Sequence, residues 1–283
     1  DRGVRPEARR AALDVEELLG AEVGAEPRLR AHDLARGERD AVREEKDLLG
    51  VRTVPNDALY GVQTLRALEN FPITGRWIGL WPELVRALAL VKHAAAQTNY
   101  ELGLLDETKA KLIIAACREI ADGALHDEFV VDMIQGGAGT STNMNANEVI
   151  ANRALELAGR KKGDYAFLHP IEHVNMAQST NDVYPTALRL ALRFAIVDLI
   201  AAMEELKVAF AAKSVEFRDL LKVGRTQLQD AVPMTLGQEF STFAVMLGED
   251  EQRLAEAASL IREINLGATA IGTGINAHPD YAH

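Results

Sequence analysis

Apolar residues recur with a helical period over most of the chain. The most continuous run spans residues 188–203, where large apolar side chains occupy nearly every side of a helix expected over residues 186–218. A helix that is apolar almost all round must be surrounded by other helices. We therefore expect a bundle core and, because the pattern is so long, contacts between subunits as well.

Four further segments have the same helical period. Helices are expected at residues 82–100, 107–123, 144–157, and from the region of Pro233 to about residue 264. A proline suits the first turn of the first of these, and Asp106 is a candidate N-cap for the second. Strand alternation is nearly absent after residue 80, so the sequence predicts a mainly α fold with long central helices.

The first 75 residues differ in composition from the rest of the chain. Residues 1–42 are rich in Arg, Glu, Ala and Gly, with too few large apolar groups to offset the entropy of ordering them, so we expect a disordered charged extension. Glycine and proline then recur at short intervals over residues 43–75, which is typical of a loop-rich segment. Within it, Arg66 and Glu69 lie three positions apart, and we expect a surface ion pair.

Charge and hydropathy exclude several classes of partner. The 283 residues carry a formal net charge of −11, and no cluster of Lys and Arg follows one helix face, which argues against nucleic acid and anionic membranes. Arg189, Arg193 and Asp198 interrupt the long apolar run, so it is not a lipid-facing span. Because no apolar signal-peptide region is present near the N-terminus, we expect a cytoplasmic location.

Cysteine and histidine usage points away from metals. Cys117 is the only cysteine, and its Ala-rich surroundings favour a small buried residue over a reactive thiol. No spacing of Cys and His resembles a metal site, and one cysteine cannot form a disulfide within the chain. We therefore expect neither a metal nor an internal disulfide.

Three polar stretches stand out, each beside a helical pattern. In residues 173–190, Ser179, Thr180 and Asn181 crowd together with other short polar groups just before the long helix. Unpaired N–H groups and the helix dipole favour a small anion at such a position. The alternative is an elaborate N-cap, because the same residue types cap helices and Pro185 suits a first turn.

The second stretch, residues 136–159, places three glycines before Thr140 and Ser141. Phosphate-binding loops also have a glycine-rich turn before a helix, but the lysine of a P-loop is absent, which disfavours nucleotide binding. Instead, glycine allows the backbone to approach a smaller anion while the two hydroxyls donate hydrogen bonds. The third stretch, residues 223–240, contains Thr226 and Gln227.

Three such stretches are hard to explain as independent caps, and we expect them to converge on one site. Its groups are mostly neutral donors, without metal ligands and without a recognisable serine, histidine and aspartate arrangement. Such a site suits a dicarboxylate and stabilises an enolate-like intermediate through positioned hydrogen bonds.

The chain closely resembles the aspartase/class II fumarase superfamily in three long motifs, GGAGTSTNMNANEVIANRALELAG, HVNMAQSTNDVYPTALRLA and GRTQLQDAVPMTLGQEF. An earlier segment, REEKDLLGVRTVPNDALYGVQTLRALENFPITG, is similar to the aspartase N-terminal segment. The resemblance covers residues 43–283 nearly end to end. It implies an N-terminal lyase domain at residues 43–180 and part of a central helical bundle at residues 181–283.

The resemblance implies reversible deamination of L-aspartate to fumarate and ammonia. It implies no cofactor and no metal, and a homotetramer whose sites combine residues from three subunits. The substrate-binding residues that the motifs imply are Thr140, Ser141, Ser179, Thr180, Asn181, Thr226 and Gln227. Residues 179–181 would hold the β-carboxylate and the aci-carboxylate that it becomes when Cβ loses its proton.

Gln227 bears on the choice of substrate. Class II fumarases usually carry His at this position of the GRTQ motif, whereas aspartases carry either residue, so Gln227 favours aspartase over the alternative, a class II fumarase. Three neighbours have structural interpretations instead. We interpret His173 as a hydrogen-bonded scaffold residue, and Glu148 and Asp182 as residues that orient loops.

The superfamily motif GSSxMPxKxNP is absent from this sequence. In the family it carries the general-base serine, and Ser214, Ser241 and Ser259 cannot replace it because all three lie in helical patterns. We therefore expect no catalytic residue here, and an N-terminal portion of an aspartase truncated before the C-terminal domain. Two functions remain open: an aspartase active only when the missing portion is supplied, or an inactive fragment that associates with intact subunits.

A truncated bundle would leave the helix over residues 188–203 without some of its packing partners. We therefore expect an exposed apolar patch on this helix.

Overall fold

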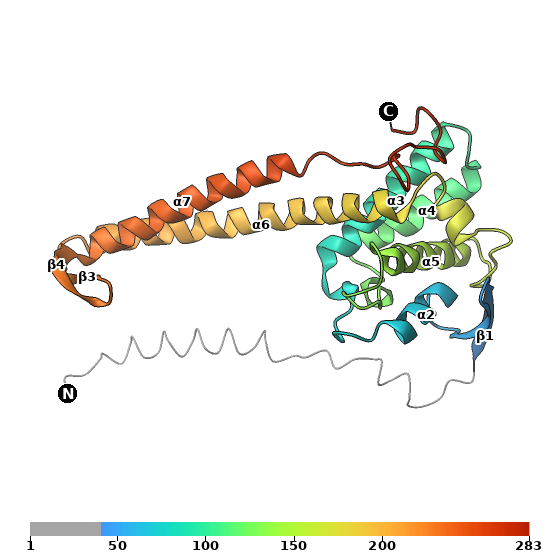
Figure 1. Cartoon of the computed structure of the whole chain (residues 1–283), viewed down its shortest axis with the longest axis horizontal. Helices are drawn as coiled ribbons and strands as arrows, with labels where there is room; N and C mark the ends of the chain where they lie inside the picture. Colours follow the sequence, from blue (N-terminus) through green and yellow to red (C-terminus); the bar gives the residue numbers. More distant parts are fainter. Residues whose placement is uncertain (1–40, 283) are drawn as a thin grey trace. The chain divides into compact units, whose positions relative to one another are not determined.

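The computed structural model describes residues 41–282, and the extension expected at residues 1–42 lies almost wholly outside them. Helices predominate in the described part, which confirms the mainly α prediction (Figure 1). The longer helices are α2 (Val62–Asn70), α3 (Pro82–Glu101), α4 (Glu107–Ala121), α5 (Thr140–Leu157), α6 (Thr180–Glu216) and α7 (Leu236–Leu260). Three short helical turns are η2 (Ile78–Leu80), η3 (His126–Glu128) and η4 (Pro170–Val174).

Local signals set where several helices begin. Pro82 is the first residue of α3, and the Asp106 carboxylate accepts a hydrogen bond from the Lys109 N–H (3.0 Å), as an N-cap does. At the start of α7, Thr235 and Gln238 exchange side-chain-to-backbone bonds of 3.1 and 2.9 Å, which is a capping box. The predicted starts of α3 and α4 are therefore confirmed.

Two helices begin earlier than the apolar pattern predicts. Helix α5 starts at Thr140 rather than at residue 144, and α6 starts at Thr180 rather than at residue 186. Their first turns consist of short polar residues, whose side chains compete for backbone hydrogen bonds and so are typical of loops and caps. The polar stretches are thus themselves the first turns of these helices.

The structure contains two antiparallel hairpins that the pattern does not predict. Strand β1 (Val42–Asp47) pairs with β2 (Gly50–Pro55), and β3 (Leu221–Thr226) pairs with β4 (Gln229–Thr235). Most residues of β3 and β4 are exposed, so no buried face imposes the two-residue period that reveals a strand. Pro233 lies in β4, opposite Val223, and the expectation that it opens a helix is wrong.

Arg66 and Glu69 do not form the expected ion pair. Arg66 donates two hydrogen bonds to the Asp47 carboxylate, at 2.7 and 2.8 Å, and lowers the pKa of that carboxyl. Glu69 instead pairs with Arg52. Both partners come from the β1–β2 hairpin, which the sequence pattern did not reveal.

The core lies where α3, α4, α5 and the first turns of α6 pack together. Leu88, Ile113, Ile150 and Val183, one from each helix, are completely buried. Cys117 lies in the same core, where burial raises the pKa of its thiol to about 12, so its expected role as a small buried residue is confirmed. This packing holds the starts of α5 and α6 next to each other.

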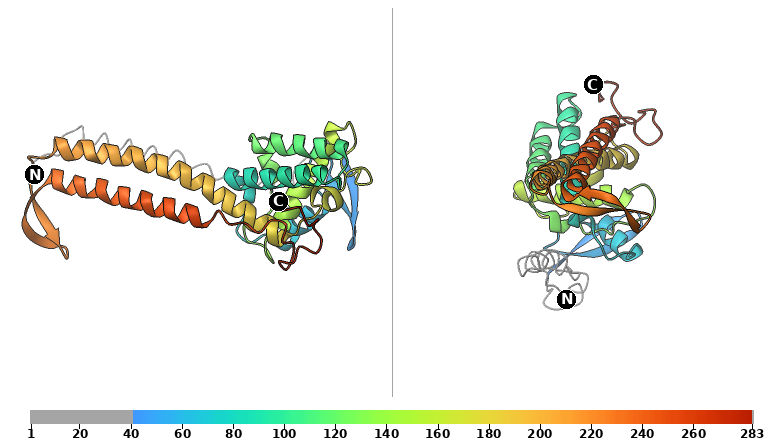
Figure 2. Two further views of the ribbon diagram at one scale, coloured as in Figure 1. Left: turned by 90° about the horizontal axis from the view of Figure 1, so that it is seen from above. Right: turned by 90° about the vertical axis from the view of Figure 1, so that its left-hand side faces the viewer.

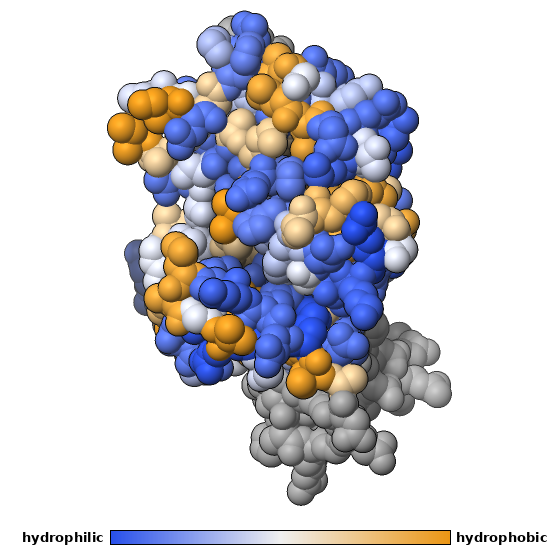
Figure 3. Space-filling view, turned by 90° about the vertical axis from the view of Figure 1, so that its right-hand side faces the viewer, coloured by the Kyte–Doolittle hydropathy of each residue, from blue (hydrophilic) through white to orange (hydrophobic). Residues whose placement is uncertain are grey.

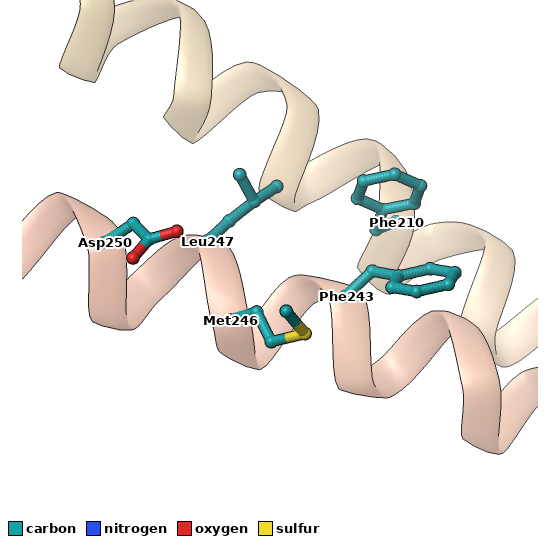
Figure 4. Close-up of a pocket in the computed structure, with 5 residues that line it drawn as sticks. All are labelled: Phe210, Phe243, Met246, Leu247 and Asp250. Atoms are coloured by element: carbon teal, nitrogen blue, oxygen red, sulfur yellow. The ribbon is translucent and has the colours of Figure 1, made fainter. Parts of the chain in front are cut away.

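Beyond Ala191, α6 has no further buried residue and pairs with α7 (Figures 1 and 2). Phe210 of α6 and Phe243 of α7 pack with ring centroids 5.5 Å apart and line an apolar groove between the two helices (Figure 4). Large apolar side chains remain exposed along the pair, among them Leu192 (46%) and Val208 (58%). The exposed apolar surface expected for this part of α6 is therefore present.

Another face of the molecule is more polar. Figure 3 shows a face on which hydrophilic residues predominate and apolar ones form separate patches. Among residues 41–282, no helix combines the length and the apolar character that crossing a membrane requires.

Candidate functional site

The N-termini of α5 and α6 bring five of the seven predicted site residues into one region. These are Thr140 and Ser141 at the start of α5, and Ser179, Thr180 and Asn181 at the start of α6. The Asn143 side chain of α5 donates a hydrogen bond to the Thr180 hydroxyl (3.2 Å) and so joins the two helix starts directly. Each start also places the positive end of a helix dipole beside these hydroxyl and amide groups, and this arrangement favours a bound anion.

Gly139 makes this close approach possible. It is the N-cap of α5 and has a φ of +85°, in the left-handed region that glycine adopts without strain. A Cβ at this position would collide with the ring of Tyr184, which belongs to α6. The glycine-rich turn therefore lets the start of α5 contact the start of α6.

The start of α6 is a capping box. The Asn181 N–H donates to Ser179 Oγ (3.3 Å), and the Ser179 N–H donates to Asp182 Oδ1 (2.9 Å). Asp182 is fully buried, and its second oxygen accepts a hydrogen bond from the Thr269 N–H (2.8 Å). The capping interpretation of this stretch is confirmed, as is the role of Asp182 in orienting the loop.

Lys92, a residue that the sequence analysis missed, lies behind this loop. It is completely buried, and its Nζ donates hydrogen bonds to Asn175 Oδ1 (2.7 Å) and Gln178 Oε1 (2.9 Å). Burial lowers the pKa of Lys92 to about 7, and a neutral amine has enough N–H groups for both contacts. Lys92 lies between Val91 and His93 in the Ala- and Leu-rich α3, and this pattern alone does not distinguish a buried lysine from an exposed one.

An amide cluster surrounds the lysine. Asn143 and Asn147 of α5 also donate to Asn175 Oδ1, at 3.1 and 3.3 Å, so three donors share one carbonyl oxygen. The Oδ1 atoms of Asn143 and Asn147 are buried and have no hydrogen-bond partner among the described residues. Because buried polar atoms are normally paired, this cluster is suited to accept further donors.

Thr226 and Gln227 lie elsewhere in the chain. They are at the tip of the β3–β4 hairpin, which follows the opposite end of α6 (Figure 1). Gln227 and Leu228 form the two-residue turn and both have positive φ, 46° and 64°. Residues other than glycine seldom adopt this conformation, but a two-residue β-hairpin turn with this twist requires positive φ at both central positions. Within one chain, the structure does not bring these two residues to the other five.

Glu148 and His173 have the structural roles expected of them. The buried Glu148 carboxylate accepts hydrogen bonds from the N–H groups of Gly61, Gln63 and Thr64 and from the Thr64 hydroxyl. Burial raises the pKa of Glu148 to about 7, in opposition to these hydrogen bonds, which lower it. His173 Nδ1 accepts a bond from the His169 N–H (2.8 Å), so its imidazole is satisfied locally. Within residues 41–282, no group of three or more His, Cys, Asp and Glu side chains is arranged to hold a metal ion.

Comparison with known proteins places the chain in a family. Residues 50–283, most of its length, match the family described as Lyase. The chain belongs to the Lyase family. The aspartate ammonia-lyase of Pseudomonas aeruginosa is 62% identical to this chain over 240 residues, which make up 84% of the chain and 51% of the relative. The chain thus spans about half the length of the curated relatives that it matches.

Solved structures agree with this assignment. A fumarate lyase:delta crystallin of Brucella melitensis, bound to cobalt, superimposes with a TM-score of 0.83 at 59% identity, covering 86% of this chain and 53% of that protein. A class II fumarase of Schistosoma mansoni gives 0.79 at 36% identity, covering 85% and 50%. The resemblance to the aspartase/class II fumarase superfamily is therefore confirmed.

Proposed function

We propose that the complete protein containing this lyase chain catalyses the reversible deamination of L-aspartate to fumarate and ammonia. The observation that carries the proposal is the meeting of Thr140 and Ser141 with residues 179–181 at two adjacent helix N-termini. Relatives named aspartate ammonia-lyase, 54–62% identical, support the same reaction. The proposed reaction uses no cofactor and no metal. The proposed location is the cytoplasm.

The proposed chemistry needs hydrogen-bond donors more than it needs charges. A general base removes a proton from Cβ of aspartate, and the electron pair moves into the adjacent carboxylate to form an aci-carboxylate. That pair then forms the carbon–carbon double bond as the C–N bond breaks in an anti-elimination, and ammonia leaves. Donors from Ser179, Thr180 and Asn181 become stronger partners as negative charge accumulates on the carboxylate, which lowers the barrier.

Thr226 and Gln227 enter the proposed site from another subunit. The 37 residues of α6 correspond to roughly 55 Å of helix, which separates its start from the hairpin that follows it. The exposed apolar strip along α6 and α7 supports a homotetramer in which these helices form a shared central bundle. On this proposal, residues 43–180 are the N-terminal lyase domain, and residues 181–283 contribute to the bundle.

The general base is proposed to come from outside this sequence. The superfamily motif GSSxMPxKxNP, which carries the base in the family, does not occur among the 283 residues. We therefore expect no turnover from this polypeptide alone, and activity once the missing motif is supplied.

Fumarate absorbance provides the test. The full-length protein and the 283-residue chain are each mixed with L-aspartate and, separately, with L-malate. We expect fumarate only from the full-length protein with aspartate. Preference for malate would favour the class II fumarase alternative and overturn the interpretation of Gln227. Turnover by the 283-residue chain would overturn the need for the serine motif.

A further inference from the structure

A segment downstream of α7 returns to the start of α6. We call residues 265–270 the strap. It makes three hydrogen bonds with α6: Asn265 Nδ2 to the Asn181 carbonyl (3.0 Å), Asn181 Nδ2 to the Ala270 carbonyl (2.7 Å), and the Thr269 N–H to Asp182 Oδ2 (2.8 Å). Asn181 therefore both receives a bond from the strap and donates one to it.

Pro185 explains why the first of these bonds is needed. Proline has no N–H, so within α6 the carbonyl four residues earlier, that of Asn181, has no helical partner. Asn265 supplies the missing donor from 84 positions downstream. The strap thus completes the hydrogen bonding of the turn that carries Asn181.

The strap is held in a strained conformation. Thr269 has a φ of +58°, which is costly for a β-branched residue, and only 4% of its surface is exposed. Its N–H binds the buried Asp182, and Leu266 packs against the main core. Residues kept in such conformations by their surroundings cluster at functional sites.

We propose that Asn265 is a positioning residue that, through the strap, fixes the orientation of the Asn181 side chain in the reaction. The inference rests on the proposed function. An amide nitrogen has two hydrogens at a fixed angle, so binding one of them to the Ala270 carbonyl aims the other. The aimed hydrogen then serves the carboxylate on which charge develops during the reaction.

The kinetic test uses the full-length protein and Asn265→Asp, which keeps the side-chain shape but replaces the donor amide with a carboxylate. Its control is Asn276→Asp, which makes the same charge change at an exposed position a few residues downstream. We expect Asn265→Asp to lower kcat about five- to tenfold, as loss of one hydrogen bond does, with KM for aspartate changed less than about twofold. The control keeps the wild-type kcat. An unchanged kcat in Asn265→Asp, or a raised KM with kcat intact, overturns the proposal.

A double-mutant cycle tests the strap without any activity measurement. Asn265→Ala should lower the thermal midpoint by about 2–4 °C in the wild-type protein. In a Pro185→Ala background the restored N–H can satisfy Asn181, so the same change should cost less than half as much. Equal costs in both backgrounds would overturn the assigned role of Asn265. A wild-type protein with no activity on aspartate but with this coupling would instead overturn the proposed function and leave the strap itself established.

Discussion

Glu148 of α5 and Thr64 of α2 are joined by two hydrogen bonds across 84 positions of sequence, from the Thr64 hydroxyl (2.7 Å) and the Thr64 N–H (3.0 Å) to one carboxylate oxygen. The side chain of Thr64 and that of Glu148 are both buried. This carboxylate takes the place of a local cap, since Gly61, the N-cap of α2, has no side chain. The start of α2 therefore depends on α5.

Replacing Glu148 with Ala should destabilise the fold by about 3 kcal/mol or more, because several buried N–H groups lose their acceptor together. Chemical denaturation measures the loss. Glu107→Ala removes a glutamate whose ion pair with Lys111 is exposed, and its cost should stay below about 0.5 kcal/mol. Equal effects of the two substitutions would contradict the role of Glu148 as a distant cap.

Lys92 should make stability depend on pH. Its pKa is lowered from 10.5 to about 7 by burial, so between these values the folded state binds fewer protons than the unfolded state. The free energy of unfolding should therefore rise with pH across this window, and Lys92 alone should raise it by about 1.4 kcal/mol per pH unit. This gain in stability is lost again as the pH falls toward 7. Denaturation at several pH values should show a flatter dependence for Lys92→Met than for the wild type. Lys111→Met, at an exposed position, should keep the wild-type slope.

Gly139 and Gly159 form a matched pair of positions. Both have positive φ, +85° and +69°, but a Cβ at Gly139 meets the Tyr184 ring whereas one at Gly159 meets nothing within 4 Å. Gly159→Ala should cost about 1 kcal/mol from the backbone alone. Gly139→Ala should cost about 1–3 kcal/mol more, because it also separates the starts of α5 and α6. Similar thermal midpoints for the two variants would show that this close approach is not required.

The Thr180 hydroxyl should matter more for the proposed reaction than for stability, to which it contributes the one hydrogen bond that it accepts from Asn143. We expect Thr180→Val in the full-length protein to lower kcat for aspartate about 100-fold, as the loss of one donor to a developing negative charge does. Thr242→Val is the control, because that hydroxyl only donates to a carbonyl of its own helix, α7. A kcat loss below about threefold for Thr180→Val would remove Thr180 from the proposed site.

The elements that sequence reasoning predicted are those whose signals are local. Pro82 and Asp106 identify helix starts through the chemistry of one turn, and the apolar run after α6 begins predicts a helix that needs neighbours. The β3–β4 hairpin was missed because most residues of its strands are exposed. Burial alternates along β1, but its inward side chains are the charged Arg43, Glu45 and Asp47, so no alternation of apolar and polar residues reveals the strand. The polar first turns of α5 and α6 were missed because their Ser, Thr and Asn residues are types that favour caps and loops over helix interiors.

The residue types of the candidate site could be predicted from the sequence, but the residues that hold them in position could not. The polar stretches themselves indicated donors for an anion. Lys92, Asn175 and Asn265 could not be identified, because each acts through a contact with residues far away in sequence. A buried lysine and an exposed one look alike in an alanine-rich helix until the packing is known.

Mixing two disabled variants tests the central claim that Thr180 and Thr226 serve one site from different chains. Full-length Thr180→Val and Thr226→Val proteins are produced separately and by co-expression, and fumarate formation from aspartate is followed in each. If the site is shared, each variant alone is nearly inactive, and random mixed oligomers regain about a quarter of the wild-type rate, because that share of sites receives both intact parts. A co-expressed mixture no more active than its parents would contradict the claim.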